Sequence, residues 1–217
     1  MALMLEKNSN LTLKIFSTGN LSTNAYLIFN EQSKDCFLVD CPAPINEYRD
    51  FILKNNFNLK FIIITHSHYD HIDGLSEFLE SFPVSFYIQK NDLSMLVNPL
   101  KNGSLVLGTS AVSIKQTPVF CKDDDIIIFG EEKIKVIETP GHTLGSISLL
   151  LNGWLFSGDT LFYHSVGRTD LPFSNPKYLQ DSIRNKLFTL DSQIKVFPGH
   201  GKPTSIGEEK ENNPFIE

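Results

Sequence analysis

Short apolar runs separated by turn-forming residues predict a chain rich in β-strands. In the first part of the chain, runs at 11–17, 24–29 and 36–40 predict three successive strands. Residues 44–56 place apolar side chains at helical spacing and predict a helix, and the β-branched run at 61–64 predicts a buried strand. The pattern therefore indicates an α/β protein that begins with strands.

The second part of the chain repeats this order of strands followed by a helix. Two hairpins are predicted, one joining 125–129 to 133–138 and one joining 146–151 to 154–157 across an Asn-Gly turn. The other expected elements are strands at 84–88 and 194–197, helices at 91–97 and 176–187, a helix after residue 73 with Asp73 as its N-cap, and a loop at 99–108. Two such successions of strands and helices predict two similar layered halves that face each other.

Composition and charge narrow the class of protein. The 217 residues, 41% of them hydrophobic, can bury one substantial core, so we expect a single domain over residues 1–217. The net charge of -6 argues against nucleic acid or an anionic membrane surface as the main partner. No apolar run is long enough to cross a bilayer, and residues 1–10 do not have the pattern of a signal peptide. Cys36, Cys41 and Cys121 follow no metal or redox spacing, so we expect reduced thiols and a cytoplasmic location.

The part of the sequence that carries chemistry begins directly after the strand expected at 61–64. Three of the six histidines fall within the ten residues that follow, together with two carboxylates. Imidazole and carboxylate groups are the ligands that zinc, iron and manganese accept. In a loop, His66 and His68 can point the same way, while Asp70 and His71 address a second position. The spacing His-x-His-x-Asp-His therefore predicts a metal site on a loop between a strand and a helix.

Three shorter stretches also place a ligand-type side chain just beyond a predicted strand. His142 stands in Pro-Gly-His-Thr, Asp159 in Ser-Gly-Asp-Thr and His200 in Pro-Gly-His-Gly. Glycine beside a ligand lets the backbone approach an ion closely, and proline fixes the turn. A lone histidine after a strand is usually an ordinary residue, but together with the first motif these side chains supply the ligands that one loop cannot. His164 is left over, either as an ordinary residue or as one that lines a substrate pocket.

Taken in this order, the four stretches resemble the metallo-β-lactamase superfamily, from about residue 16 to the end of the chain. Within it, Pro-Gly-His-Thr, Ser-Gly-Asp-Thr-Leu-Phe, Gly-Arg-Thr-Asp and Pro-Gly-His-Gly resemble the glyoxalase II-like hydrolases, which are relatives of hydroxyacylglutathione hydrolase. The resemblance implies an α/β fold built as a four-layer αβ/βα sandwich, with the site at the edges of the sheets.

The resemblance also implies that seven side chains hold two divalent metal ions. The first ion would take His66, His68 and His142, the second would take Asp70, His71 and His200, and Asp159 would bridge the two. Zinc is the expected metal, with iron and manganese as the alternatives.

Two further residues gain a role only through the resemblance. Asp40 resembles an outer acid that orients a ligand histidine, and the alternative is an aspartate that ends a strand in a turn. Arg168 falls where the family places a basic substrate-binding residue, and a guanidinium suits an anionic group. A structural ion pair between Arg168 and Asp170 is the alternative.

The activity that the resemblance implies is hydrolysis of a small anionic thioester, such as an S-2-hydroxyacylglutathione. A hydroxide bridging the two metals would be the nucleophile, and Asp70 could orient it or move its proton. No nucleic-acid or membrane partner is expected. Glyoxalase II proper carries a C-terminal helical extension that this sequence does not show, which leaves a smaller or different substrate open.

Other activities of the same superfamily are the alternatives. A persulfide dioxygenase would use one iron held by His66, His142 and Asp159, whereas His200 favours two metals. A nuclease would need a basic arm that clamps RNA, which this acidic sequence does not show. β-Lactamases of the commonest zinc class have an arginine after the motif aspartate and a cysteine ligand, where this sequence has His71 and Asp159.

Overall fold

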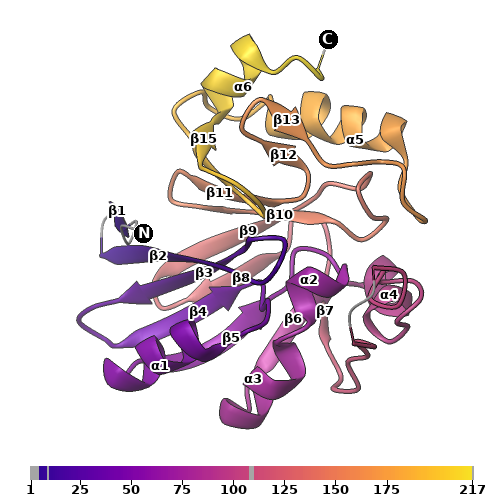
Figure 1. Cartoon of the computed structure of the whole chain (residues 1–217). Helices are drawn as coiled ribbons and strands as arrows, with labels where there is room; N and C mark the ends of the chain where they lie inside the picture. Colours follow the sequence, from indigo (N-terminus) through magenta and orange to yellow (C-terminus); the bar gives the residue numbers. More distant parts are fainter. Residues whose placement is uncertain (1–4, 9, 108–109, 217) are drawn as a thin grey trace. The chain divides into compact units, whose positions relative to one another are not determined.

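The computed structural model describes residues 5–8, 10–107 and 110–216. The chain divides into two compact units, each built around a large β-sheet (Figure 1). The first unit consists of Met1–Ile64, His68–Tyr87 and Ser94–Val119. The second unit consists of Thr65–Ser67, Ile88–Leu93 and Phe120–Glu217. That residues 1–217 form one domain stays a prediction.

Seven strands form the first sheet, and they lie side by side in the order of the sequence. They are β1 (Leu5–Asn8), β2 (Leu11–Thr18), β3 (Thr23–Asn30), β4 (Asp35–Val39), β5 (Asn58–Ile63), β6 (Ser85–Gln89) and β7 (Val119–Cys121). β1 to β4 pair antiparallel, and β5 pairs parallel with both β4 and β6. The strands predicted at 11–17, 24–29 and 36–40 are confirmed as β2, β3 and β4.

Aromatic side chains hold two helices on the first sheet. The helices of the first unit are α1 (Asn46–Lys54), α2 (Tyr69–Ile72) and α3 (Leu75–Ser81), and a 3-10 turn η1 (Lys90–Asp92) and helix α4 (Leu93–Leu96) follow β6. The ring centroid of Tyr48 in α1 lies 5.9 Å from that of Phe16 in β2 and 5.2 Å from that of Phe78 in α3. Phe51 of α1 lies 5.9 Å from Phe29 of β3. α1 and α3 therefore cover the same face of this sheet (Figure 1).

The second sheet has six strands in the order β15-β14-β11-β10-β9-β8. They are β8 (Ile126–Phe129), β9 (Glu132–Glu138), β10 (Ile147–Leu151), β11 (Trp154–Gly158), β14 (Lys195–Pro198) and β15 (Thr204–Ser205), and β12 (Leu161–Phe162) with β13 (Ser165–Val166) forms a separate hairpin. β11 and β14 run parallel, and the other neighbours are antiparallel. Both predicted hairpins are confirmed, and Asn152 and Gly153 have φ values of 47° and 79°, as a two-residue hairpin turn requires.

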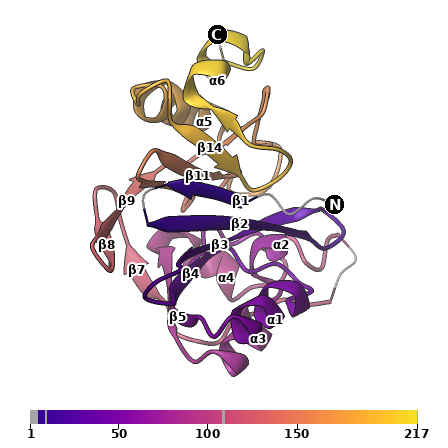
Figure 2. The ribbon, with the colours of Figure 1, turned by 90° about the vertical axis from the view of Figure 1, so that its left-hand side faces the viewer.

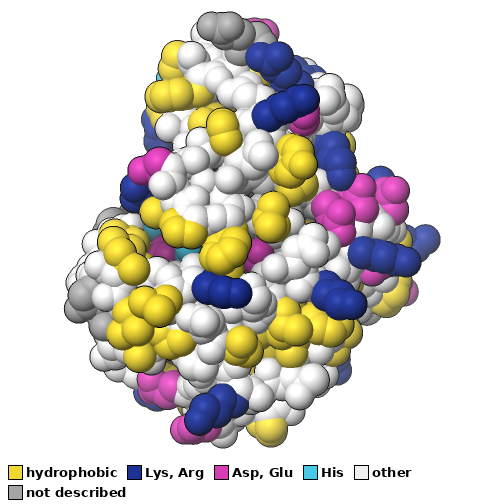
Figure 3. Space-filling model, turned by 90° about the vertical axis from the view of Figure 1, so that its right-hand side faces the viewer, with side chains coloured by type: hydrophobic (Ala, Val, Ile, Leu, Met, Phe, Trp, Pro, Cys, Tyr) yellow, Lys and Arg dark blue, Asp and Glu magenta, His cyan; other side chains and the backbone are white. Residues whose placement is uncertain are grey.

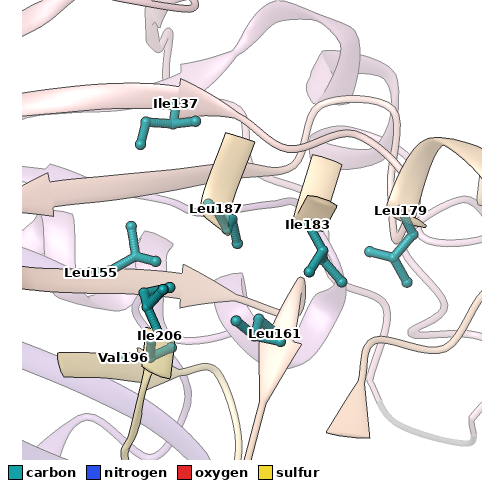
Figure 4. Close-up of a cluster of buried hydrophobic side chains, with 8 residues drawn as sticks. All are labelled: Ile137, Leu155, Leu161, Leu179, Ile183, Leu187, Val196 and Ile206. Carbon is teal, nitrogen blue, oxygen red and sulfur yellow. The ribbon is translucent and has the colours of Figure 1, made fainter. Parts of the chain in front are cut away.

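Helices of the second unit pack against this second sheet. α5 (Pro176–Ser182) continues as a π-helical turn, η2 (Ile183–Leu187), and α6 (Ile206–Asn212) follows β15 (Figure 2). The buried side chains that join these helices to β9, β11, β12 and β14 are Ile137, Leu155, Leu161, Leu179, Ile183, Leu187, Val196 and Ile206 (Figure 4). This cluster packs the helices against β11 and β14, the strands that Asp159 and His200 follow.

Two predictions about the first histidine motif are wrong. Gly74, not Asp73, is the N-cap of α3, and Asp73 Oδ1 instead accepts a hydrogen bond from the Ala43 amide, 2.6 Å away. The segment after His68 is also not a plain loop, because Tyr69–Ile72 forms the helical turn α2. Asp70 and His71 therefore lie on a helix.

The sequence pattern does not predict β1, β7, β12, β13, β15 or α6. β12, β13 and β15 have two residues each, too few to show an alternation of apolar and polar positions. α6 buries Ile206 as its one apolar side chain, so it has no apolar stripe in the sequence.

Burial affects the cysteine thiols. Cys36, Cys41 and Cys121 are buried and form no disulfide, and burial raises the pKa of the Cys36 and Cys121 thiols to about 12. Among the described residues, no helix combines the length and the apolar character that a bilayer-spanning segment needs.

Candidate metal centre

Three histidines of the second unit surround the carboxylate of Asp159. Oδ2 of that carboxylate lies 3.4 Å from His142 Nε2, 3.5 Å from His200 Nε2 and 4.0 Å from His66 Nε2. His66 and His142 are each 2% exposed, and Asp159 is 8% exposed. Four ligand-type groups that are remote from one another in the sequence therefore converge in a largely buried place.

The ends of parallel strands bring two of these groups together. Asp159 directly follows β11, and His200 lies two residues beyond β14. Because β11 and β14 are parallel, their carboxyl ends meet at the same edge of the sheet. At this edge the Gly199 amide donates a hydrogen bond to the Gly158 carbonyl at 2.9 Å.

Gly158, the last residue of β11, lets this strand lie against the segment that carries His66. Its φ is 49°, in the left-handed region that favours glycine. A Cβ atom at this position would lie 2.7 Å from Thr65 Oγ1 and 2.8 Å from Thr65 Cβ. The Thr65 carbonyl also accepts a hydrogen bond from the Ile147 amide, the first of β10, at 2.9 Å. Gly158 therefore lets β11 lie close to Thr65, and a close approach of this backbone to an ion stays a prediction.

Hydrogen bonds to Nδ1 orient two of the imidazole rings. His142 Nδ1 lies 2.9 Å from the Arg168 carbonyl oxygen. Because a carbonyl can only accept, Nδ1 donates the proton, and Nε2 of the neutral ring then presents its lone pair on the side of Asp159. His66 Nδ1 lies 3.2 Å from Thr65 Oγ1. A protein partner at one ring nitrogen and a metal at the other is the usual arrangement of a ligand histidine.

The first unit carries the other three predicted ligands within the short segment 68–71. His68 is the N-cap residue of α2, and Asp70 and His71 lie inside this helical turn. His71 Nε2 lies 3.5 Å from Asp70 Oδ2. One turn of helix is therefore enough to present this set.

Residues from two strands of the first sheet hold Asp70 and His71. Asp40, which follows β4 and is 1% exposed, places its Oδ2 atom 2.8 Å from His71 Nδ1. Thr23 of β3 donates a hydrogen bond from Oγ1 to Asp70 Oδ2 at 2.8 Å. The contact expected of an acid that orients a ligand histidine is therefore present at Asp40, and its role in metal binding stays a prediction.

The donor atoms fit divalent metal ions. Candidate metal-binding groups among the described residues consist of imidazoles and carboxylates, namely His66, His68, Asp70, His71, His142, Asp159 and His200. These are the seven side chains that the sequence predicts as ligands. Nitrogen and oxygen ligands of this kind suit zinc, iron and manganese.

The two remaining candidates have protein partners. Arg168 donates two hydrogen bonds to Asp170, from Nε to Oδ1 and from Nη2 to Oδ2, both at 2.7 Å, and the pair is exposed. This hydrogen bonding lowers the pKa of the Asp170 carboxyl to about 2. His164 Nε2 lies 2.7 Å from Glu208 Oε1, and its ring stacks on Tyr163 with centroids 4.0 Å apart. The structural alternative for Arg168 is thus observed, and His164 lies outside the groups of candidate ligands.

Sequence reasoning missed two residues that contact the ligands or their neighbours. Thr23 carries no motif, and its contact with Asp70 joins residues far apart in the chain. Asp92 accepts hydrogen bonds from Ser67 and Thr143, which directly follow two candidate ligand histidines. The one available signal was that Asp92, like the predicted ligands, follows a strand end.

The α/β fold and the cluster of histidines and aspartates define a metal-binding protein, and comparison with known families agrees. The profile described as the Metallo-beta-lactamase superfamily matches residues 18–200. The chain therefore belongs to the metallo-β-lactamase superfamily, and the predicted fold class is confirmed.

Two relatives resemble the chain over nearly its whole length. The probable metallo-hydrolase YqgX of Bacillus subtilis (strain 168) is 31% identical over 200 residues, which cover 91% of this chain and 94% of YqgX. Hydroxyacylglutathione hydrolase GloC of Haemophilus influenzae is 27% identical over 209 residues, which cover 95% of this chain and 98% of GloC. The superfamily and the names of these relatives indicate a metallo-hydrolase.

Solved structures resemble the chain to a similar extent. The BLEG-1 B3 metallo-beta-lactamase has a TM-score of 0.89 at 30% identity and covers 94% of this chain and 99% of its own. The di-iron-bound form of TTHA1623 has a TM-score of 0.84 at 28% identity, with 93% and 99% covered. ETHE1 from Myxococcus xanthus has a TM-score of 0.76 at 29% identity, with 93% and 83% covered.

Proposed function

We propose that this protein is a dinuclear-metal hydrolase that uses the predicted histidine and aspartate ligands. The observation that carries the proposal is the Asp159 carboxylate, which has three imidazole nitrogens within 4.0 Å of its Oδ2 atom. Such a carboxylate suits a bridging ligand because each of its oxygens can bind one ion.

The residues of the chain would orient and activate the reacting groups. Metal ions held by these ligands would lower the pKa of bound water from about 15.7 to about 7 and polarise a substrate carbonyl. The Arg168 carbonyl and the Asp40 carboxylate hold the rings of His142 and His71 through Nδ1. Asp70, fixed by the Thr23 hydroxyl, would orient the nucleophile or accept its proton.

The substrate class that we propose is a small thioester. A thiolate, with a thiol pKa of about 8.5, can leave without full protonation, so the centre needs no strong general acid. The name of GloC, hydroxyacylglutathione hydrolase, supports this class. A cavity of about 380 Å³ in the first unit is lined by Asp70 together with Leu21, Thr23, Pro44 and Tyr69, among others. This volume suits a small molecule.

An anionic group on the substrate is part of the proposal. Arg168 presents a planar guanidinium that now binds Asp170 in a bidentate way. Because an exposed ion pair contributes little free energy, a carboxylate of the substrate could replace Asp170 at small cost.

Zinc is the metal that we propose, with iron and manganese as alternatives. Imidazole and carboxylate ligands accept all three ions, so availability decides which is bound. The di-iron-bound form of TTHA1623 supports a two-metal centre in this fold.

A mononuclear-iron persulfide dioxygenase is the second candidate. His66, His142 and Asp159, all in the second unit, provide the two-histidine, one-carboxylate set that such an enzyme needs. His200, 3.5 Å from the same carboxylate, favours the two-metal hydrolase because it adds a ligand that this set does not require.

A nuclease of the same superfamily is the weakest candidate. On the face drawn in Figure 3, the basic side chains of the described residues lie scattered among acidic and apolar ones. A net charge of -6 also opposes binding of a polyanion.

Metal content and activity, measured on the same protein, test the proposal. The protein is purified without chelators, its metal content per chain is determined, and hydrolysis of S-lactoylglutathione is followed. Two metals with thioester turnover are expected. One iron, no hydrolysis and oxygen consumption with glutathione persulfide would establish the dioxygenase, and turnover of a chromogenic cephalosporin alone would indicate a β-lactamase.

A pair of histidine variants sharpens this test. His200→Ala should remove one metal and nearly all hydrolysis. His164→Ala is the matched control, because His164 is a histidine of the same unit whose ring binds Glu208. A protein that kept its full metal content and activity in His200→Ala would not be the proposed hydrolase.

A further inference from the structure

Asp92 is a buried carboxylate of the second unit that accepts three hydrogen bonds. It ends the turn η1 after β6 and is 1% exposed. Its Oδ2 atom accepts from the Ser67 amide at 2.8 Å and from Thr143 Oγ1 at 2.9 Å. Its Oδ1 atom accepts from the Gly145 amide at 2.8 Å.

These bonds join two segments that carry candidate metal ligands. Ser67 directly follows His66, and Thr143 directly follows His142. The two imidazole rings lie 4.8 Å apart between centroids, at an interplanar angle of 80°. One carboxylate therefore ties together two ligand-bearing segments that are far apart in the sequence.

We propose that Asp92 is a positioning residue that holds His66 and His142 at the separation a metal ion requires. This inference rests on the proposed function in one respect, namely that these two histidines bind metal. Asp92 itself lies outside the ligand set and acts through the backbone next to each histidine.

The surroundings of Asp92 are built to receive a carboxylate. Thr143 Oγ1 also lies 2.8 Å from Ser146 Oγ, which can donate to it and leave the Thr143 proton for Asp92. A Cβ atom at Gly145 would lie 2.6 Å from Asp92 Cγ and Oδ1, so no side chain fits there. Three donor groups point at the two carboxylate oxygens of Asp92. A carboxylate suits this place because, when ionised, it accepts hydrogen bonds and donates none.

Asp92→Asn keeps the shape of this side chain but breaks the arrangement. If the amide nitrogen took the place of Oδ1, it would face the Gly145 N–H, and if it took the place of Oδ2, it would face the Ser67 N–H. In either orientation two donors face each other and one of the three hydrogen bonds is lost, either that from Gly145 or that from Ser67. Residues that orient metal ligands typically account for about a 10- to 100-fold difference in metal affinity.

Glu209→Gln is the matched control. Glu209 is a carboxylate of the same unit, also 1% exposed, and it accepts hydrogen bonds from Thr204 Oγ1, the His164 amide and Asn213 Nδ2. None of these donors stands next to a candidate ligand in the sequence. Loss of a buried carboxylate should therefore destabilise both variants, whereas metal affinity should fall in Asp92→Asn alone.

The test measures zinc affinity by competition with a chelator, on folded metal-free protein, and records the visible spectrum of the cobalt-substituted form. We expect zinc binding to weaken about 10- to 100-fold in Asp92→Asn, with an altered cobalt spectrum, and to stay within about twofold of the original protein in Glu209→Gln. A milder pair of variants, at Thr143, keeps the test valid if Asp92→Asn does not fold. Thr143→Val should weaken zinc binding, and Thr143→Ser, which keeps the hydroxyl, should restore it.

The outcomes separate this inference from the proposed function. An original protein that binds no metal would overturn the proposed function. An original protein that binds two metals, with unchanged zinc affinity in Asp92→Asn and Thr143→Val, would overturn the positioning role alone. Equal losses of zinc affinity in Asp92→Asn and Glu209→Gln would show a general structural effect and would also overturn it.

Discussion

The two sets of candidate ligands are built in opposite ways. In the first unit, His68, Asp70 and His71 lie on a single turn of helix, and nearby strands add only supporting contacts. In the second unit, Asp159 and the histidines around it come from separate segments that meet only when the sheet forms. The first set is local, and the second is assembled by tertiary structure.

This difference predicts different sensitivities to mutation. A local set keeps its geometry as long as its helical turn is intact, so substitutions around it should act mainly on individual ligands. An assembled set depends on close backbone approaches and buried hydrogen bonds, so substitutions that touch no ligand should also disturb it.

Removing the centre of the assembled set should have the largest effect. Asp159→Ala should lose most of the bound metal and lower kcat/KM for S-lactoylglutathione by at least about 1000-fold, because several kcal/mol of charge stabilisation is lost. Metal analysis and steady-state kinetics would measure both. Asp181→Ala, at an exposed aspartate of α5, is the control. Two tightly bound metals with full activity in Asp159→Ala would show that Asp159 does not bridge them.

Disturbing the support of the local set should have a smaller effect. Asp40→Asn keeps an acceptor for His71 Nδ1 but removes the charge that makes the ring a better ligand. We expect about a 10-fold loss of affinity for one metal and little change for the other, measured by chelator competition. Asp50→Asn, at a partly exposed aspartate paired with Arg49, should change neither. Equal loss of both metals in Asp40→Asn would mean that Asp40 does not act through His71 alone.

A substitution that touches no ligand atom should show how far the assembled set depends on backbone approach. Gly158→Ala combines a φ of 49° with a Cβ atom 2.7 Å from Thr65 Oγ1, so it should lower the free energy of unfolding of the metal-free protein by about 2 kcal/mol or more. Gly130→Ala has a similar φ of 59° but meets no atom within 4 Å, and it should cost about 1 kcal/mol. Urea denaturation would compare the two variants, and equal losses would indicate that φ alone matters.

The exposed pair of Arg168 and Asp170 should give the smallest change. Hydrogen bonding from Arg168 lowers the pKa of Asp170 to about 2. The stabilisation from this pair is therefore fully present at pH values above the ordinary pKa of an aspartate, and it is lost as the pH falls through about 2. Arg168→Met should return the Asp170 pKa to its ordinary range in an NMR titration, with the unfolding midpoint at neutral pH unchanged. A higher KM for an anionic thioester with unchanged kcat would assign Arg168 to substrate binding, and an unchanged KM would oppose that part of the proposal.

The sequence by itself determined the chemical class of the site and the fold. Ligand chemistry resides in residue types, and the seven candidate ligands stand in four short motifs that follow predicted strands. The same local patterns predicted the main strands, both large hairpins and the helix at 176–187, because alternation and turn residues act over a few positions.

Only the tertiary structure decided how those residues are held. The partners of Asp92, Asp40 and Thr23 lie far away in the chain, and no local pattern records a hydrogen bond between such segments. Asp73 is a second example. Its position predicts a local helix cap, but in the structure its carboxylate accepts a long-range hydrogen bond from the Ala43 amide. Residue type and spacing are properties of the chain, whereas the register and contacts that orient a ligand form only when distant strands pair and bury their polar groups.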